Sequence, residues 1–309
     1  MARRRRQRGR PVHGILVLDK RQGVTSNKVL QEIKSLFGAA KAGHTGSLDP
    51  LATGVLPICF GEATKFSQYL LDADKGYLAG IRFGVRTATG DAEGEPIEQR
   101  PVNFSEQELL TTLEQFTGEI SQVPSMYSAI KVDGQPLYKL AREGIEVERK
   151  ARNVVIRELS LTSFNQDTAE IQVACSKGTY IRTLVEDIGE ALGCGAYVTS
   201  LRRTSAGPFT LDNAYTIEQL DEVCQNGGHE ALDERLQPID MALKLLPQVI
   251  LGETTAYYLS QGQPVLVPRA PTTGFVRLYQ EGSQLAFLGI GEILDDGRVA
   301  PRRLVRIYS

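Results

Sequence analysis

A glycine-rich segment at residues 43–54, GHTGSLDPLATG, restricts the fold of this chain more than any other feature of its sequence. Glycine adopts backbone angles that other residues resist, so the three glycines of the segment predict a sharply shaped loop. Pro50 fixes its own φ and disfavours a helical conformation at Asp49, which precedes it. The only carboxylate of the segment is therefore predicted to lie in an extended stretch of a rigid loop.

Asp49 has two interpretations at this stage. Its neighbours Leu48, Leu51 and Ala52 are apolar, and a partly desolvated carboxylate suits nucleophilic or acid–base chemistry. Alternatively, the side chain makes an Asx-type hydrogen bond and only stabilises a turn. The loop taken alone leaves both interpretations open.

Length and composition indicate a soluble globular protein. The 309 residues suffice for one large domain or two unequal ones, and the hydrophobic (41%) and charged (23%) contents are typical of this class. The apolar run at residues 55–60 is too short to span a membrane, and the one at residues 14–18 is too short for a signal peptide. The four cysteines form no CxxC pair, so we expect reduced thiols, a cytoplasmic location and no zinc site.

Positive charge is concentrated at the N-terminus, where residues 1–10 contain six arginines and no acidic residue. Without these six, the basic residues fall from 35 to 29 against 37 acidic ones, a net charge of −8. Any nucleic-acid contact must therefore use local basic patches or the arm itself. The arm is interpreted either as a solvated tail or as an RNA-contacting segment, and the two roles are compatible.

Hydrophobic periodicity predicts an α+β fold, because strand-like alternation and helical spacing are mixed along the chain. Ser105 and Glu108 form a capping-box pattern at one helix start, and Gly38 marks a helix end. The predicted strands are residues 14–18, 77–83 and 169–175; the predicted helices begin near Ser26, at residue 63, at Ser105 and within residues 178–193.

The character of the chain changes near residues 245–247. After this point, short strand-like runs (QPVLV, GFVRLY, AFLGIGEI and RLVRIYS) broken by glycine and proline predict a small β-barrel of about 60 residues. We therefore divide the chain into an arm at residues 1–10, a main domain at 11–246 and a C-terminal domain at 247–309. Residues 123–152 are interpreted as an excursion from the core of the main domain.

Several common catalytic motifs are absent from the sequence. It contains no Gly-Lys dipeptide for a Walker A loop, no dinucleotide fingerprint, and none of the zinc deaminase, GxSxG or HExxH patterns. Asp49 also lacks neighbouring carboxylates with which to build a metal site. We therefore expect chemistry that needs neither a metal nor another cofactor.

Two further residues are candidates for the site. Tyr77 opens a predicted strand and is either a core aromatic or a stacking platform for a base. Arg182 lies at the start of a predicted helix, where the macrodipole disfavours a cation by up to about 1 kcal/mol. An anion would compensate that arginine, and Asp49 is a candidate, because an Arg–carboxylate pair favours the ionised acid. A surface arginine is the alternative.

Five motifs, which follow one another along the chain in the order typical of one family, carry a resemblance to that family. Together they closely resemble the bacterial tRNA pseudouridine synthases of the TruB family, and the resemblance runs from GILVLDK at residues 14–20 to VAPRRLV at 299–305. RNA-guided archaeal and eukaryotic relatives share the catalytic loop, but the insertion at 123–152 resembles the stand-alone bacterial type. The motifs are GHTGSLDPLATGVLP, the K-x-Y segment at 75–77, VPSMYSAIKVDG at 123–134, GTYIRTL at 178–184 and LRRTSAGPF at 201–209.

The resemblance implies a role for each matching residue. Asp49 matches the catalytic aspartate, Tyr77 the aromatic that stacks on the target uracil, and Arg182 the arginine that pairs with the aspartate. The insertion matches a mobile thumb that closes on RNA. The supporting residues are Tyr180 and Leu201, which line the same pocket, His44, which supports the flipped-out RNA, and Lys20, which braces the site.

The fold and activity are implied in the same way. The family has a mixed, largely antiparallel sheet flanked by helices and loops, followed by a PUA-like barrel. It isomerises uridine to pseudouridine at position 55 in the T-loop of tRNA, without a cofactor. The expected partner is the T-arm stem-loop of tRNA, with no guide RNA and no membrane, and we expect a monomer with an accompanying tRNA-folding role.

Two other functions compete with this one. A non-catalytic RNA-binding module would need only the basic arm and the C-terminal domain, but it gives no reason for Asp49, Tyr77 and Arg182 to occur together. A glycosidase or nucleoside hydrolase usually employs two carboxylates, and the glycine-rich loop offers only one.

Overall fold

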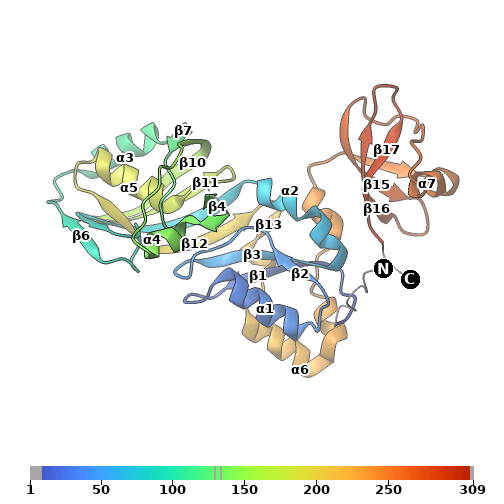
Figure 1. Ribbon diagram of the computed structural model, residues 1–309, viewed down its shortest axis with the longest axis horizontal. Coiled ribbons are helices and arrows are strands. Elements are labelled where there is room, and N and C mark those ends of the chain that lie inside the picture. Colours follow the sequence, from blue (N-terminus) through green and yellow to red (C-terminus); the bar gives the residue numbers. More distant parts are fainter. Residues whose placement is uncertain (1–8, 129, 133, 307–309) are drawn as a thin grey trace.

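The computed structural model describes residues 9–128, 130–132 and 134–306, so residues 1–8 of the predicted arm lie outside the described residues. The molecule is elongated, with a long twisted sheet through the body and a smaller sheet at one end (Figure 1). The helices that the structure describes are all too short or too polar to cross a lipid bilayer.

The large sheet has nine strands and confirms the predicted mixed, largely antiparallel architecture. Its path runs β1-β3-β12-β4-β11-β10-β7, with β2 paired to β3 and β13 paired to β12. The strands β3 and β12 run parallel, and the other neighbours on this path are antiparallel. The bounds are β1 (Gly14–Lys20), β2 (Ala42–His44), β3 (Thr53–Phe60), β4 (Lys75–Phe83), β7 (Gly118–Gln122), β10 (Arg152–Asn165), β11 (Thr168–Cys175), β12 (Ala196–Ala206) and β13 (Phe209–Thr210).

Strands β1 and β3 are apolar without alternation because the sheet is covered on both faces here. Successive side chains of a strand point to opposite faces. Leu16 and Leu18 of β1 join the core cluster that contains α1, whereas Ile15 and Val17 join a second cluster that contains Phe66. This two-sided burial fixes β3, which follows the glycine-rich loop, together with its partner strand β1.

Local capping signals account for the helices around the sheet. Thr25 caps α1 (Ser26–Leu36) by accepting a hydrogen bond from the Lys28 amide, and Gly38 follows its end with φ +57°. The predicted capping box of Ser105 and Glu108 is present at the start of α3 (Glu106–Gln115). The helix predicted at residues 63–71 is a 3₁₀ helix (Gly61–Phe66) continued by α2 (Ser67–Asp72), and the acidic stretch near residues 221–234 forms α6 (Ile217–Asp233).

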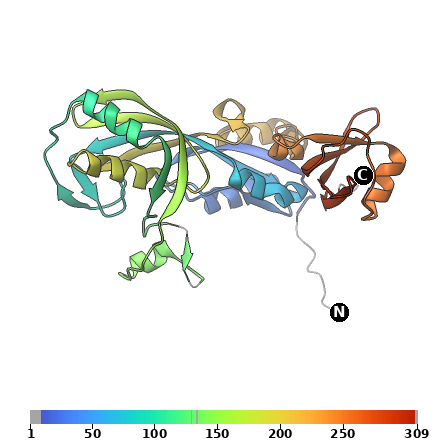
Figure 2. The ribbon, with the colours of Figure 1, turned by 90° about the horizontal axis from the view of Figure 1, so that it is seen from above.

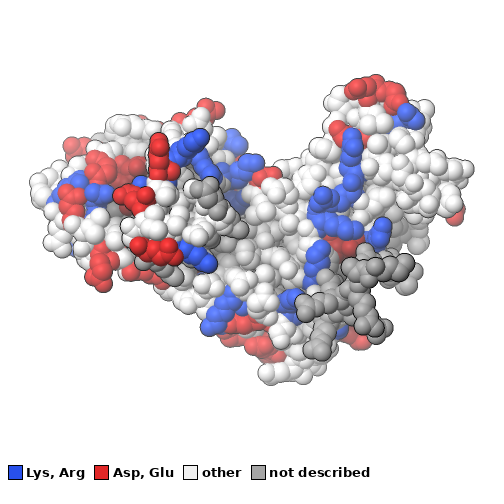
Figure 3. Space-filling view, viewed as in Figure 1, with Lys and Arg blue, Asp and Glu red and all other residues white. Residues whose placement is uncertain are grey.

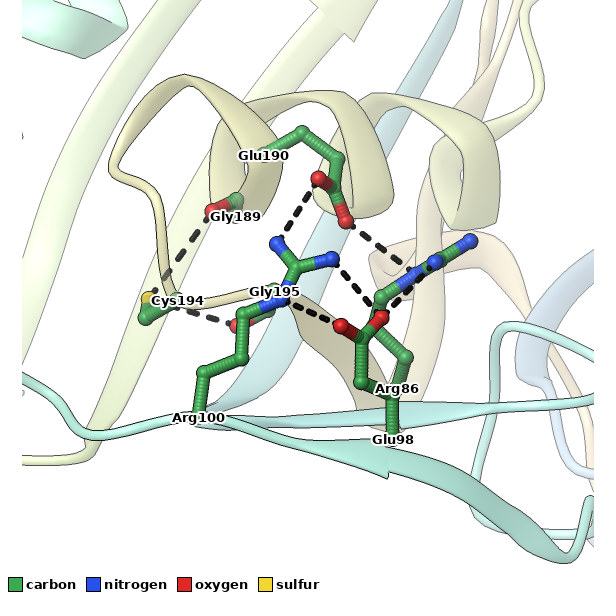
Figure 4. Close-up of polar contacts among 7 residues, drawn as sticks. All are labelled: Arg86, Glu98, Arg100, Gly189, Glu190, Cys194 and Gly195. Atoms are coloured by element: carbon green, nitrogen blue, oxygen red, sulfur yellow. Dashed lines mark hydrogen bonds and ion pairs between the residues drawn. The ribbon is translucent and has the colours of Figure 1, made fainter.

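Helix α5 (Ile181–Ala191) buries Leu184 and Ile188 in the large core. An ion-pair network ties its last turns to the small sheet of β5 (Val85–Thr87) and β6 (Pro96–Gln99), as Figure 4 shows. Arg100 bridges Glu98 at 2.7 Å and Glu190 at 2.9 Å, and Arg86 contacts the same two carboxylates. Hydrogen bonds from these arginines lower the pKa of Glu98 to about 2. The network fixes one end of α5, while its other end faces the site described below.

Residues 123–151, which we call the thumb segment, leave the end of β7 and return into β10. They project from the body as a separate excursion, as Figure 2 shows. Within this segment lie β8 (Lys131–Val132), β9 (Gln135–Pro136) and α4 (Leu137–Arg142). The root of the thumb segment is fixed to the start of α5, because the Gln122 side chain accepts a hydrogen bond from the Tyr180 amide at 3.1 Å.

The C-terminal part forms the predicted separate β-rich unit with its own apolar core, but its sheet does not close into a barrel. Its order is β14-β15-β16-β17, and in the described residues its edge strands do not pair with each other. The predicted strand QPVLV makes only a single bridge, at Val265, because Pro264 within it and Pro268 directly after it have no backbone N–H. The elements are β14 (Gln248–Leu251), α7 (Glu253–Ser260), β15 (Gly274–Gln280), β16 (Ala286–Ile293) and β17 (Val299–Leu304).

Candidate active site

The loop between β2 and β3 carries Asp49 and is held by hydrogen bonds from side chains of β1 and α1. Ser26, at the first residue of α1, donates a hydrogen bond to the Leu48 carbonyl and accepts one from the Leu48 amide, at 3.0 and 2.8 Å. The fully buried Lys20 donates to the carbonyls of Arg21, Val24 and Pro50. Lys20 therefore braces the loop, as the family resemblance implies, without lining the cavity beside Asp49.

Gly54 sets how closely this loop approaches β12. Its φ is +99°, and a Cβ at this position would lie 2.2 Å from the Arg203 carbonyl oxygen. That oxygen cannot withdraw, because Gly54 and Arg203 are register partners in the parallel β3–β12 pair. The end of the Asp49 loop is thus fixed directly to the strand that forms one wall of the site.

We expect Gly54→Ala to destabilise the protein by about 3 kcal/mol or more, because backbone strain and a clash with backbone add together. Urea unfolding monitored by circular dichroism measures this loss. Gly118→Ala is the matched control, since Gly118 has φ +97° but no atom lies within 4 Å of its Cβ position. Equal losses in the two variants would contradict the steric argument.

The predicted pair of Asp49 and Arg182 is present. Arg182 lies in the first turn of α5, as predicted, and its Nη2 is 3.0 Å from Asp49 Oδ2. The Arg182 side chain is only 7% exposed, whereas that of Asp49 keeps 45% of its surface open to the cavity. The arginine is therefore a fixed group and the carboxylate is the accessible one.

Arg182 holds a second carboxylate that the sequence analysis missed. Asp91 Oδ2 lies 3.3 Å from Arg182 Nη1, and the Asp91 side chain is 4% exposed. Its other oxygen accepts hydrogen bonds from the Thr89 hydroxyl and the Glu93 amide. Asp91 lies between Gly90 and Gly94, and glycines also lie on either side of Asp49. This similarity could have marked Asp91 as a candidate from the sequence.

Backbone carbonyls complete the surroundings of Arg182. Its Nη1 donates to the Thr89 carbonyl at 2.9 Å, and its Nη2 donates to the Tyr127 carbonyl, at the root of the thumb segment, at 2.8 Å. The guanidinium thus links the Asp49 loop, the Asp91 loop and the thumb segment through one charged group.

Desolvation shifts the pKa of Asp49 upward. Burial raises the pKa above its usual value, Arg182 opposes this rise, and the negative charge of Asp91 adds to it. The ion pair therefore moderates the pKa of Asp49 without lowering it below the usual range. A carboxylate with a raised pKa is a stronger base and nucleophile than a fully solvated one.

Five of the predicted residues surround one cavity of about 320 Å³. Asp49 and Arg182 lie on one side, and Tyr77 of β4 and Leu201 of β12 form another wall. Tyr180, the residue before α5, completes the set. The structure thus brings together residues from four distant parts of the chain.

His44 lines a neighbouring cavity of about 590 Å³, which shares Asp49 and Arg182 with the first. It ends β2, and its buried Nδ1 has no hydrogen-bond partner within the described part of the chain. Burial lowers the pKa of His44, and the positive charge of Arg203 lowers it further. Both effects favour a neutral imidazole beside the Asp49 loop.

Arg203, another residue that the sequence analysis did not single out, lies in the wall of the first cavity. It is 1% exposed, and its guanidinium donates to the carbonyls of Val55 at 2.6 Å and Gly46 at 3.2 Å. It follows Leu201 by two residues on β12, so both side chains point to the same face, and Tyr77 is its register partner on β4. In the sequence LRR at residues 201–203, the first and third residues of a strand share a face, so the prediction of Leu201 in the cavity wall could have pointed to Arg203 as well.

Lys20 gives the stability of the protein a specific pH dependence. Burial lowers the pKa of Lys20 from 10.5 to about 8, although the charge of Asp49 opposes this. Between these values the unfolded chain binds more protons than the folded one, so stability contributed by this residue rises with pH. We expect the free energy of unfolding of wild type, minus that of Lys20→Met, to increase from pH 8 to pH 10.

Urea unfolding of both proteins at the two pH values tests this. Lys75, whose pKa burial also lowers to about 8, is present in both proteins, so its contribution cancels in the difference. A difference that stays constant or decreases would contradict the assignment of this titration to Lys20.

Across residues 9–128, 130–132 and 134–306, no group of three or more His, Cys, Asp and Glu side chains is arranged to hold a metal ion.

Comparisons with known proteins agree with this geometry. Residues 34–181 match the family model "TruB family pseudouridylate synthase (N terminal domain)", residues 182–244 match "tRNA pseudouridylate synthase B C-terminal domain", and residues 247–305 match "Pseudouridine synthase II TruB, C-terminal". The tRNA pseudouridine synthase B of Pseudomonas aeruginosa (strain UCBPP-PA14) is 58% identical over 297 residues, covering 96% of this chain and 97% of that protein. The tRNA pseudouridine synthase B of Tolumonas auensis is 55% identical over 313 residues, with 99% and 96% covered.

Solved structures of related proteins share the fold. A chain of a Cbf5-Nop10-Gar1 complex superposes with a TM-score of 0.71 at 26% identity, covering 91% of this chain and 78% of that one. A chain of an H/ACA RNP bound to a substrate RNA reaches a TM-score of 0.73 at 23% identity, with 98% and 91% covered. With these similarities and with Asp49, Tyr77 and Arg182 around one cavity, the chain belongs to the TruB family of pseudouridine synthases.

Proposed function

We propose that this protein isomerises uridine to pseudouridine in tRNA, at position 55 of the T-loop, with Asp49 as the catalytic residue. The observation that carries this proposal is the accessible Asp49 carboxylate, paired to the buried Arg182 in a cavity walled by Tyr77. The names of the similar curated proteins support the reaction and the tRNA substrate.

Substrate binding requires that the target nucleotide leave its stack. This extrusion costs a few kcal/mol, and stacking on an aromatic ring returns about 1–3 kcal/mol. Tyr77 offers that ring, Leu201 lines the same cavity, and the volume of about 320 Å³ is within the range of pockets that enclose small ligands. Tyr180 lines the same cavity and His44 the neighbouring one, which supports assigning both residues to contact with the flipped-out RNA.

The chemistry breaks the C1′–N1 bond, rotates the uracil and joins its C5 to C1′. Asp49 acts by attack at C1′, by addition at C6 or by proton abstraction at C2′, and each of these roles needs an accessible carboxylate. Arg182 orients Asp49, and Lys20 braces its loop. Because the product is an isomer of the substrate, no redox partner or group donor enters the balance.

RNA recognition uses local positive charge in this proposal. Lys and Arg side chains gather in separate groups on one face, including where the C-terminal sheet meets the body (Figure 3). Lys65, Arg302 and Arg303 line a groove at that junction. We assign residues 11–246 to catalysis. The projecting thumb segment and residues 247–309 are assigned to RNA contact. We also propose that the protein is a monomer that works without a guide RNA and assists tRNA folding.

A hydrolase remains the competing enzyme class, because Asp91 supplies the second carboxylate that the loop lacks. However, Asp91 is buried, and both of its oxygens are occupied, by Arg182 on one side and by Thr89 and Glu93 on the other. A carboxyl group held in this way cannot protonate a leaving group, which favours isomerisation over hydrolysis.

Incubation of the protein with a T-arm stem-loop, followed by nucleoside analysis, tests the proposal. We expect pseudouridine at the target position and no free uracil. A stem-loop with cytidine at that position is the control. Free uracil would support a hydrolase, and binding without any product would support an RNA-binding module.

A further inference from the structure

Within the described residues, Arg203 is a buried cation that forms no ion pair with a carboxylate. It is the largest of the fully buried side chains. The nearby arginines differ in this respect, because Arg202 pairs with Asp19 at 2.6 Å and Arg182 pairs with Asp49 and Asp91. The acceptors of Arg203 are the neutral carbonyls of Val55 and Gly46.

Such an arrangement is unfavourable for folding alone. Removal of a guanidinium from water costs several kcal/mol, and neutral carbonyls recover only part of that cost. A neutral side chain of similar size would fill the same space with less penalty. The charge therefore needs an explanation beyond packing.

The position of the charge supplies one. Arg203 lines the cavity beside Tyr77 and Leu201, on the wall where the uracil ring lies in the proposed function. Its influence extends across the site: burial is the main cause that lowers the pKa values of His44 and Lys75, and the positive charge of Arg203 lowers both further. The cavity therefore presents a fixed positive potential on the side of the base.

The proposed reaction generates a negative charge at this place. When the C1′–N1 bond breaks, its electron pair stays on N1 and spreads to the uracil O2 and O4. C5 then bonds to C1′, the proton on C5 leaves and N1 gains a proton, so atoms and charge balance. Addition of Asp49 to C6 also places negative charge on the uracil oxygens, and proton abstraction at C2′ releases the same uracil anion.

We propose that Arg203 is the fixed positive charge that stabilises the uracil anion during this rearrangement. The inference rests on the proposed function and adds a residue to it. Its physical basis is that of an oxyanion hole, in which a preorganised donor in a water-poor cavity meets charge that develops only during reaction. The hydrogen bonds to Val55 and Gly46 hold the guanidinium in place before the substrate arrives.

A comparison of two substrates tests the proposal. The target position of a T-arm stem-loop carries either uridine or 5-fluorouridine, whose base is a better leaving group because fluorine stabilises its anion. Loss of the target nucleoside is followed with enzyme in excess over RNA. For Arg203→Gln we expect a loss of about 100-fold with uridine and a loss about tenfold smaller with 5-fluorouridine, whose anion needs less stabilisation. Arg203→Lys, which keeps the charge, should retain the wild-type ratio between the two substrates.

The ratio of the two rates is measured on one protein sample, so a partly folded variant does not distort it. Arg202→Gln is the matched control, because it neutralises the adjacent arginine of the same strand and should leave the ratio unchanged. Equal losses with both substrates, or no loss, would overturn the proposal and leave Arg203 a role in positioning Tyr77 and the loop. Failure of wild type to form pseudouridine would instead refute the proposed function itself.

Discussion

Asp49→Asn is expected to abolish pseudouridine formation while leaving the affinity for tRNA nearly unchanged. The amide keeps the shape and volume of the carboxylate, but it can neither attack carbon nor accept a proton, so the rate should fall by more than about 1,000-fold. Single-turnover assays with a T-arm stem-loop measure the rate, and filter binding measures the affinity.

Asp167→Asn serves as the matched control for Asp49→Asn. Asp167 pairs with Arg82 near the turn between β10 and β11, and Asp167 does not line the cavity. This control should react at the wild-type rate. Measurable pseudouridine from a pure Asp49→Asn preparation would refute the catalytic assignment.

Arg182→Met is the second change with a large expected effect. The apolar side chain leaves Asp91 buried without its cation, which should destabilise the protein by about 3–5 kcal/mol. It also removes the partner that orients Asp49, so the single-turnover rate should fall by about 100-fold or more, while affinity for RNA changes little. Urea unfolding, single-turnover rates and filter binding measure the three quantities.

A double variant separates the two effects of Arg182. Arg182→Met with Asp91→Asn removes the uncompensated charge and should recover much of the stability, but not the rate. A variant whose only defect is weaker RNA binding would contradict the pairing of Arg182 with Asp49 as the basis of its role.

Local signals predicted the parts of the molecule that are determined locally. The glycine-rich loop, the helix starts at Ser26 and Ser105, and the position of Arg182 in a first helical turn all depend on residues a few positions apart. The pairing of Asp49 with Arg182 was predicted because a cation at a helix start needs an anion. The wall of Tyr77 and Leu201 required the family resemblance in addition.

The residues that were missed depend on long-range register. Arg203 lies beside Tyr77 because β12 pairs with β4 in one particular register, which no local pattern reveals. Asp91 likewise reaches Arg182 from a loop that is distant in the sequence, so no local pattern reveals this contact. The C-terminal helix α7 was not predicted, because its sequence, ETTAYYLS, contains two threonines and two tyrosines, which favour strands.

The attachment of the thumb segment at the edge of the large sheet has a consequence for how such proteins diversify. The segment joins β7, the last strand, to β10, so changes in its length interrupt no pairing between interior strands. The side chains that we propose to meet the base, on β4 and β12, belong to the middle of that sheet. Substrate range and reaction chemistry can therefore evolve at different rates. A different hairpin inserted between β7 and β10 offers a route to direct the same chemistry to another RNA.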